Sequence, residues 1–503
     1  MPRSLGRMLR CSGAGVGLML LAGCVVGPDY VAPRPAAPDD WTSWRSGDPS
    51  LVAAPAAGEG LSPDWWKTFK DPVLDSLIAR ALAASPDMQT AALHFAQARV
   101  QRMGAAAAGL PQISANVDVN RQRQSEYGAS TRLFDAIGSD RNALAKLLSQ
   151  PFTLYRGGFD ASWEPDLWGK VRRSLEAADA GIAQQGALLD LTRLTVAAEV
   201  AQTYFELRTT QRQIALSRED IALLQDRVSL VTARVEGGLD DHTDLATEEA
   251  ALHALEAQLP FLLTREAAQA NAIALLLGER PGSLAQTLKP GGPAISALPP
   301  DLALGLPSEV ALHRPDVRAA EARLHAATAR IGVAVADLYP SIRLGGGFKL
   351  ESYRSETLFD WASRTWSIVP SLDLPLFDGG RRRSVVKLRK LEQREAAVDF
   401  QQTVLRSWQE IDDALSQFTS ERQQRAKLLA RVDDARGVFD LAGARYRSGA
   451  VNYLAVIDAE RALLQARRDL AENEGRLRAS YVAVNKAMGN TPPEADANAA
   501  AMP

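Results

Sequence analysis

The side chains best suited to catalysis are few, and their spacing fits no catalytic motif. The 503 residues include two cysteines and five histidines. The histidines form no H-E-x-x-H zinc motif and no cysteine accompanies them, while the glycines at 345–347 lack the Lys-Ser/Thr of a phosphate loop. His242 beside a turn could bind a metal, but a solvated histidine is the simpler interpretation. The acidic pairs Asp240-Asp241 and Asp433-Asp434 are typical of charged helix ends and faces. We therefore expect no enzyme, no catalytic residue, no metal and no cofactor.

One reactive side chain, the Cys24 thiol, has an informative context. Residues 1–23 carry three arginines, then a short apolar run, then the small residues Ala22 and Gly23, the pattern of a signal peptide. The stretch LAGC resembles the bacterial lipoprotein box, which implies a diacylglyceryl group on the thiol of Cys24 and an acyl chain on its amino group. A buried structural cysteine is the alternative, and the position between a signal sequence and Gly-Pro disfavours it. Each buried methylene contributes ~0.8 kcal/mol, so two or more acyl chains anchor a protein durably.

The residues around Cys24 indicate a compartment. With Cys11 removed and Cys24 acylated, no thiol is left for a disulfide. Val25 takes the place of the Asp that retains lipoproteins in the inner membrane, so the resemblance implies the outer membrane. Residues 24–62 are rich in proline and predict an extended segment that lies over the folded body. The net charge of −3 gives no general attraction to nucleic acid.

The chain contains two copies of one pattern. Pro86 and Pro111 match Pro315 and Pro340, and the helix-ending glycines recur in the same register. The copies span 63–283 and 308–493, with a linker at 284–307 and a disordered tail expected at 494–503. The interval from Pro111 to Gly169 is longer than that from Pro340 to Gly379, which predicts a longer surface loop in the first copy. The other aligned glycine pairs are Gly238 with Gly449 and Gly278 with Gly489.

Each copy predicts a helix, two strands and a helical hairpin. The first helix runs from Pro86 to Gly109 with Ser85 as a cap. The long helices of the two hairpins are expected at 174–236 and 384–447, about 95 Å each at 1.5 Å per residue. Heptad spacing of apolar residues predicts coiled-coil seams, and Pro260 predicts a kink in the first return helix. Because the two short helices together match the long one, we expect them to stack end to end beside it in each half.

The predicted strands alternate apolar and polar residues, as a sheet with one oily face requires. In a lipid-anchored protein such a face suggests contact with the membrane. Four strands leave open edges, and lipid tolerates only closed barrels, the smallest with about eight strands, so at least two chains must contribute. The alternative is a sheet packed on a soluble core. Pro370 in the last strand favours an edge position. The apolar positions are Ile113, Ala115, Val117 and Val119; Phe159, Ala161 and Trp163; Ile342, Leu344, Phe348 and Leu350; and Trp366, Ile368, Leu372 and Leu374.

The acylated CVVGPDY, the segment WWKTFKDPVLDSLIARAL, the duplicated plan and YRSGAVNYLAVIDAERALL together resemble the outer membrane efflux protein family. The similarity is to its lipoprotein branch, which is OprM-like, NodT-type and more distantly TolC-like. It implies a mainly α fold with a small β part, and a homotrimer in which four strands per chain form a twelve-stranded outer-membrane barrel above a coiled-coil periplasmic tunnel. It also implies the exit duct of a tripartite pump for drugs or other small toxic compounds. The partners would be a periplasmic adaptor (membrane fusion) protein, an inner-membrane transporter of the resistance-nodulation-division (RND) type, and outer-membrane lipid.

The resemblance also implies two sites. Leu454, Asp458 and Arg461 lie on one face of the second return helix and match the family's periplasmic gate, a leucine ring with Asp and Arg pairs. The first copy has Thr243, Thr247 and Ala250 at these positions, so only the second hairpin could form the gate. Without the resemblance, Asp458 and Arg461 are an ordinary exposed helix pair. The tips expected to touch the adaptor are Gly237-Gly238 and Ser448-Gly449, which also suit helix C-caps.

Two other functions remain open from the sequence. A type I secretion duct exports proteins through the same architecture, and the acyl anchor favours small-molecule efflux over it. A helical lipoprotein that scaffolds the envelope without forming a channel would share the anchor and the heptads. Oligomer formation and pore activity separate that protein from a channel.

Overall fold

The computed structural model describes residues 25–34, 37–52, 56–57, 62–128, 141–239, 241–290, 298–299, 302–304, 310 and 313–493. The expected signal peptide, Cys24 and the expected C-terminal tail fall outside these residues. The chain divides into two compact units. The first comprises the segment up to Val31 with 99–181 and 325–395, and the second comprises 32–98, 182–324 and 396–503.

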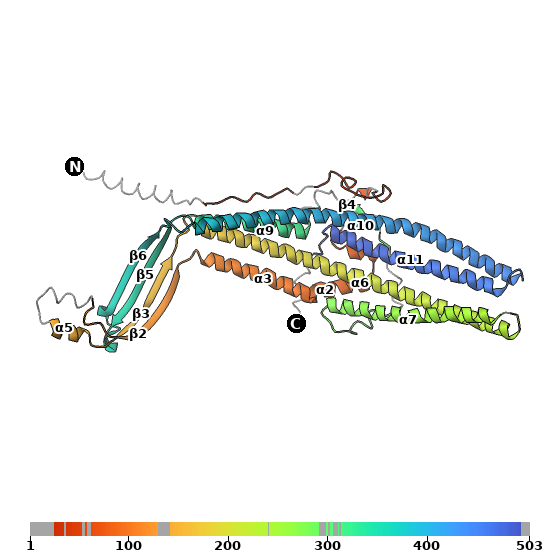
Figure 1. Ribbon diagram of the computed structural model, residues 1–503, viewed down its shortest axis with the longest axis horizontal. Helices are drawn as coiled ribbons and strands as arrows, with labels where there is room; N and C mark the ends of the chain where they lie inside the picture. Colours follow the sequence, from red (N-terminus) through yellow and green to blue (C-terminus); the bar gives the residue numbers. More distant parts are fainter. Residues whose placement is uncertain are drawn as a thin grey trace. The chain divides into compact units, whose positions relative to one another are not determined.

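The element order confirms a mainly α chain with a duplicated plan (Figure 1). The long helices α6 and α10 have 67 residues each, slightly more than predicted, and the return helices α7 and α11 have 35 each. The first copy contains α3 (Pro86–Ala107), β2 (Gln112–Gln122), β3 (Phe152–Trp163), α6 (Lys170–Glu236) and α7 (His242–Leu276). The second contains α9 (Pro315–Ala336), β5 (Ser341–Ser352), β6 (Arg364–Asp373), α10 (Arg381–Arg447) and α11 (Tyr453–Ala487).

Four glycines end the four hairpin helices in the same way. After α6, Leu239 N–H donates to Arg234 O at 2.9 Å and Gly238 N–H to Val235 O at 2.9 Å, a Schellman motif. The same pair of bonds follows α7, α10 and α11. The motif requires a left-handed residue, and the φ angles are 69°, 72°, 74° and 76° at Gly238, Gly278, Gly449 and Gly489.

The return helices stack end to end on the short helices, as predicted. A Cβ on Gly278, which follows α7, would lie 3.3 Å from Cδ of Pro86 at the start of α3. A Cβ on Gly489, which follows α11, would lie 3.4 Å from Cδ of Pro315 at the start of α9. In the second copy the buried Arg314 guanidinium also donates to Ala487 O and so caps the end of α11.

The four long strands form one antiparallel sheet in the order β2-β3-β5-β6. The predicted apolar residues share a face: Ala115 lies opposite Phe159, Phe159 opposite Phe348, and Phe348 opposite Trp366. Pro370 lies in β6, an edge strand, where a missing N–H is tolerated. The predicted alternation is therefore confirmed in all four strands, although Leu374 lies one residue beyond β6.

The structure departs from or refines the sequence predictions at three local positions. Ser85 is not a side-chain cap: it is fully buried at the end of α2 (Pro72–Ala84), and its Oγ has no partner among the described residues. The long β2–β3 connection is not only a loop, because it contains the helix α5 (Arg141–Leu148). Asp241 caps α7 through Thr243 N–H at 3.2 Å, and Pro260 lies within α7, which runs on to Leu276, so a bend there stays a prediction.

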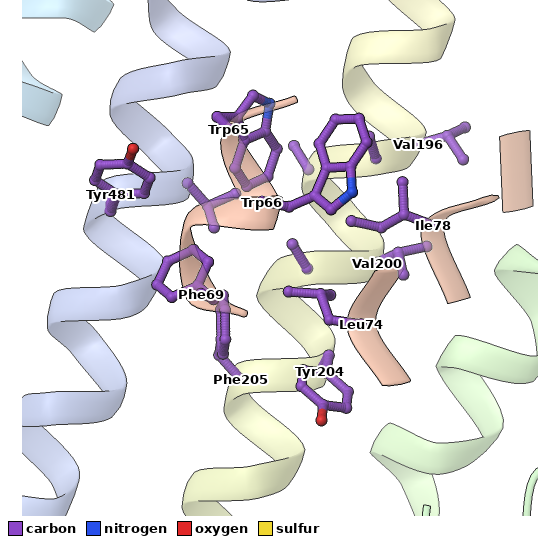
Figure 2. Close-up of a cluster of buried hydrophobic side chains, with 14 of the residues drawn as sticks. Trp65, Trp66, Phe69, Leu74, Ile78, Val196, Val200, Tyr204, Phe205 and Tyr481 are labelled. Atoms are coloured by element: carbon purple, nitrogen blue, oxygen red, sulfur yellow. The ribbon is translucent and has the colours of Figure 1, made fainter. Parts of the chain in front are cut away.

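The core of the second unit surrounds the 3₁₀ turn η1 (Trp65–Phe69) and helix α2 (Figure 2). The centroid of the Phe69 ring lies 4.6 Å from that of Phe205 on α6 and 5.5 Å from that of Tyr481 on α11. The Asp71 carboxylate caps α2 and accepts a 2.7 Å bond from the Tyr204 hydroxyl, so both of these polar groups are satisfied. Trp65 and Trp66 are buried here.

Replacing Gly489 by Ala should destabilise the second unit more than replacing Gly449 by Ala. Both glycines have positive φ, which costs an L-residue about 1 kcal/mol. Only at Gly489 would the new Cβ lie 2.9 Å from Arg314 Cγ, whereas the space beside Gly449 is open. Thermal melting followed by circular dichroism measures the difference, and equal shifts for the two variants would contradict the stacked joint.

Candidate functional site

The three predicted gate residues lie in the first turns of α11. Asn452 caps this helix, with its Oδ1 accepting from Ala455 N–H at 3.2 Å. Leu454 and Arg461 are half-buried, and the Asp458 side chain is 62% exposed. The spacing of four and three residues places them on one side of the helix. Their role in a gate stays a prediction.

Arg227 on α6 ties three helices together beside these residues. Its Nη2 lies 2.7 Å from Glu248 Oε1 on α7, and its Nη1 pairs with Asp458 Oδ1 on α11. The Arg227 and Glu248 side chains are each only 13% exposed. A shielded ion pair is screened less than a surface pair, and removing one partner leaves a buried charge. Sequence reasoning missed Arg227, although it flanks the predicted seam at Leu224 and Val228, where coiled coils place charged residues.

Within one chain, Asp458 does not pair with Arg461. Asp458 Oδ1 is bound by Arg227, and Arg461 has no hydrogen bond or ion pair among the described residues. The neighbouring Glu460 is partly shielded from water, and this burial raises its pKa, with Arg467 opposing the shift and Asp226 adding to it. The site thus holds Arg227 paired with Glu248 and Asp458, and one cation, Arg461, available to another group.

The two hairpin tips are exposed, and backbone hydrogen bonds close their turns. The Gly237-Gly238 and Ser448-Gly449 turns end their long helices with Schellman bonds. Ser448 Oγ also donates to Arg445 O at 2.9 Å. At the second tip the rings of Tyr446 and Tyr453 lie 5.2 Å apart, which fixes the turn from both helices. The tips have the exposure that an adaptor contact requires, and that contact stays a prediction.

The two return helices differ in burial. Helix α11 is buried along most of its length, between α10, which it contacts through Arg425–Glu474 at 3.1 Å, and α6, which it contacts through Arg468–Asp220 at 2.5 Å. Helix α7 buries only Gln269, Ile273 and Ala274. Large apolar side chains on the outer sides of α7 and α10 are exposed, among them Phe261, Val398 and Leu405. Exposed apolar surfaces of this kind are typical of protein–protein interfaces.

The sheet has one apolar and one polar face. On the apolar face Val117 is 83% exposed and Ile368 is 74% exposed. On the polar face Asp160 accepts from Asn116 at 2.7 Å and pairs with Lys349 at 2.9 Å. Within the described chain the outer edges of β2 and β6 have no paired strand. A soluble sheet would not leave so large an apolar surface uncovered.

The first unit also contains a cavity of about 580 Å³ beside the stacked rings of Trp168 and Tyr339. Its lining mixes charges of both signs, including Lys170 and Asp337, which pair at 2.6 Å. In the part of the chain that the structure covers, His, Cys, Asp and Glu side chains form no group of three or more able to hold a metal. The described helices include none with the length and apolar character needed to cross a membrane.

Known proteins match this chain over most of its length. A model of the family described as outer membrane efflux protein matches residues 77–279 and 306–490. The pyoverdine export outer membrane protein OpmQ of Pseudomonas putida is 32% identical over 453 residues, which cover 88% of this chain and 93% of OpmQ. The probable outer membrane lipoprotein SilC of Salmonella typhimurium is 28% identical over 460 residues, covering 90% of this chain and 93% of SilC.

A solved structure of the outer-membrane channel OprN superposes with a TM-score of 0.80 at 28% sequence identity. The match covers 93% of this chain and 100% of the OprN chain. Because the family model covers well over half of the sequence and OpmQ aligns along nearly all of both chains, this chain belongs to the outer membrane efflux protein family.

Proposed function

We infer that this protein is the outer-membrane channel of an RND-type efflux pump, through which drugs or other small toxic compounds leave the periplasm. The observation that carries this function is the sheet with one exposed apolar face and two edges that no described strand of the chain pairs with. In hydrocarbon every backbone N–H and C=O needs a partner, so these edges must pair with strands of other copies. Transport through such a duct needs no catalytic residue, and we propose none.

We propose three copies per channel, which gives twelve strands. Strand β2 of one copy would pair with β6 of the next, with the apolar face toward lipid and the polar face toward the pore. The exposed sides of α7 and α10 would then pack between copies and extend the wall of the duct. Partners would be a periplasmic adaptor at the hairpin tips and an inner-membrane RND transporter.

We also propose that Cys24 carries a diacylglyceryl group and an N-acyl chain. Its sequence context supports this, and SilC, whose name includes the word lipoprotein, is a relative over 90% of the chain. The acyl chains would add a second attachment to the membrane in which the sheet is embedded.

At the periplasmic end we propose that three sets of Leu454, Asp458 and Arg461 close the duct. In each copy the Arg227–Asp458 pair would hold α11 against α6, and Arg461 would be available to an acidic group of the next copy. Movement of α11 at this end requires breaking the Arg227 contact. Adaptor binding at the tips would supply the free energy for that step.

Placing a charge on the apolar sheet face should block assembly. Val117→Arg exposes a guanidinium to hydrocarbon at a cost of roughly 2–4 kcal/mol per copy. Ser114→Arg is the matched control, because Ser114 lies opposite Asp160 on the polar face of the same strand. The heat-stable oligomer on gels and the outer-membrane fraction should fall only for Val117→Arg. Normal assembly of Val117→Arg would contradict contact of this face with lipid.

Combining Leu454→Ala with Asp458→Ala should raise the conductance of the resting channel in planar bilayers, because the leucine ring and the Asp458 partner of Arg227 are removed together. Thr243→Ala with Thr247→Ala, at the matching positions of the first hairpin, should leave the conductance unchanged. A closed state unaffected by the first pair would remove these residues from the gate.

Arg227→Gln and Asp458→Asn should each raise the conductance of the resting channel. The double variant should raise the conductance little beyond either single change. Both substitutions break the same pair, so their effects should not be additive. Arg431→Gln is the control, since its pair with Asp469 joins α10 to α11 without Arg227. Full additivity of Arg227→Gln and Asp458→Asn would show that this pair does not hold the gate.

A further inference from the structure

The residues that follow Cys24 lie in defined contacts on the first unit. Val26 N–H donates to Trp168 O at 3.2 Å. The next residue, Gly27, has a φ of 95°, a backbone conformation that residues other than Gly rarely adopt. An extended segment that lies over the folded body, as the proline-rich composition predicts, needs neither a fixed hydrogen bond nor a left-handed residue.

Arg173 on α6 holds this segment. Its guanidinium donates to Asp29 Oδ1 at 2.6 Å and to Val26 O at 3.3 Å, and it also reaches Gly27 O at 3.5 Å. A further 2.7 Å bond to Glu176 fixes its orientation. The Arg173 side chain is only 5% exposed. A shielded arginine that binds a carboxylate and backbone carbonyls of one short segment is a built recognition site.

Three glycines allow the backbones to touch. A Cβ on Gly27 would lie 2.5 Å from Gly332 Cα on α9, and a Cβ on Gly332 would lie 2.7 Å from Arg173 Cγ. A Cβ on Gly169, just before α6, would lie 2.9 Å from Val25 Cγ1. A Cβ at Gly27 or Gly332 would clash with backbone or with Arg173, and a Cβ at Gly169 would clash with Val25, so the contact requires glycine at all three positions.

The far end of the segment is held by a ring contact. Tyr30 stacks on His325 of α9, with ring centroids 4.1 Å apart and planes 11° apart. His325 Nε2 lies 3.0 Å from Glu176 Oε1, and Glu176 also binds Arg173. The two ends of the segment are therefore linked through one carboxylate.

The duplication supplies an internal comparison. In the second copy Gly379 and Arg383 correspond to Gly169 and Arg173. The space around Gly379 is open, and Arg383 is exposed with no hydrogen bond or ion pair among the described residues. Aligning Pro86 with Pro315 places Met103, an exposed side chain, where the second copy has Gly332. Only one of the two duplicated positions is built to receive a peptide.

We propose that residues 25–30 are a docking peptide, and that Arg173, Gly332 and His325 form its receptor site on the same chain. Docking fixes Val25 at Gly169, where α6 begins seven residues after the end of β3. In so far as Cys24 is acylated, which rests on the proposed function, the lipid departs from this point and is held in register with the sheet. The docking peptide thus sets where the anchor meets the membrane.

Chymotrypsin cleavage after Tyr30 tests this in the purified full-length protein. The rate is measured by mass spectrometry relative to cleavage after the exposed Tyr127, which serves as the internal standard. The native segment should be cut slowly. Arg173→Gln should accelerate the cut by roughly ten- to a hundredfold, since it removes a charged bond and a carbonyl contact. Arg383→Gln, the matched arginine of the second copy, should leave the rate unchanged.

A second pair of variants leaves Arg173 intact. Gly27→Ala should accelerate the cut through its clash with Gly332, whereas Gly47→Ala, with a similar φ of 101° and open space, should not. Rapid cleavage after Tyr30 in the native chain, or slow cleavage in both Arg173→Gln and Gly27→Ala, would overturn the proposal. The mass of the peptide that contains residue 24 reports acylation separately. An unmodified but protected segment would reject the lipid anchor and leave docking intact.

Discussion

The structure depends on one requirement, that backbone polar groups find partners where water is absent. A four-stranded sheet with an exposed apolar face satisfies this requirement internally for β3 and β5 only, since among the described strands β2 and β6 each keep one open edge. In water the edges could be solvated but the apolar face could not be tolerated. In lipid the face is favourable and the edges are not. In the proposed trimer, association with other copies resolves both conflicts, and the channel function follows from that closure.

The helical part solves a related problem of length. Two helices of 67 residues need partners along their whole length. Each copy supplies two shorter helices, and the end of one meets the start of the other in space at a glycine. At Gly278 and Gly489 the absence of a side chain lets one helix end meet the next helix start. The duplication then leaves α11 enclosed and leaves α7 and α10 with exposed sides. Both the sheet and the helices are therefore incomplete in a single chain.

Much of this was predictable from sequence, because the determining features are local. Positive-φ glycines, proline positions and strict alternation fix helix ends and strands with little help from tertiary structure. The Arg227 contact was not predictable, since it depends on how three helices from distant parts of the sequence are rotated against one another. The cap assigned to Ser85 was wrong because burial at the end of α2 took precedence over its hydrogen-bonding preference. The docking of Gly27 was likewise hidden, because the glycine that receives it lies about 300 residues away in the sequence.

The number of chains in the assembled particle tests the central claim most directly. Native mass spectrometry of the protein extracted in mild detergent, combined with ion conductance of the same preparation across planar bilayers, measures both closure and pore formation. The account predicts a particle of three chains that conducts. A monodisperse single chain with no conductance would contradict it, because a lone sheet cannot satisfy its edges in lipid.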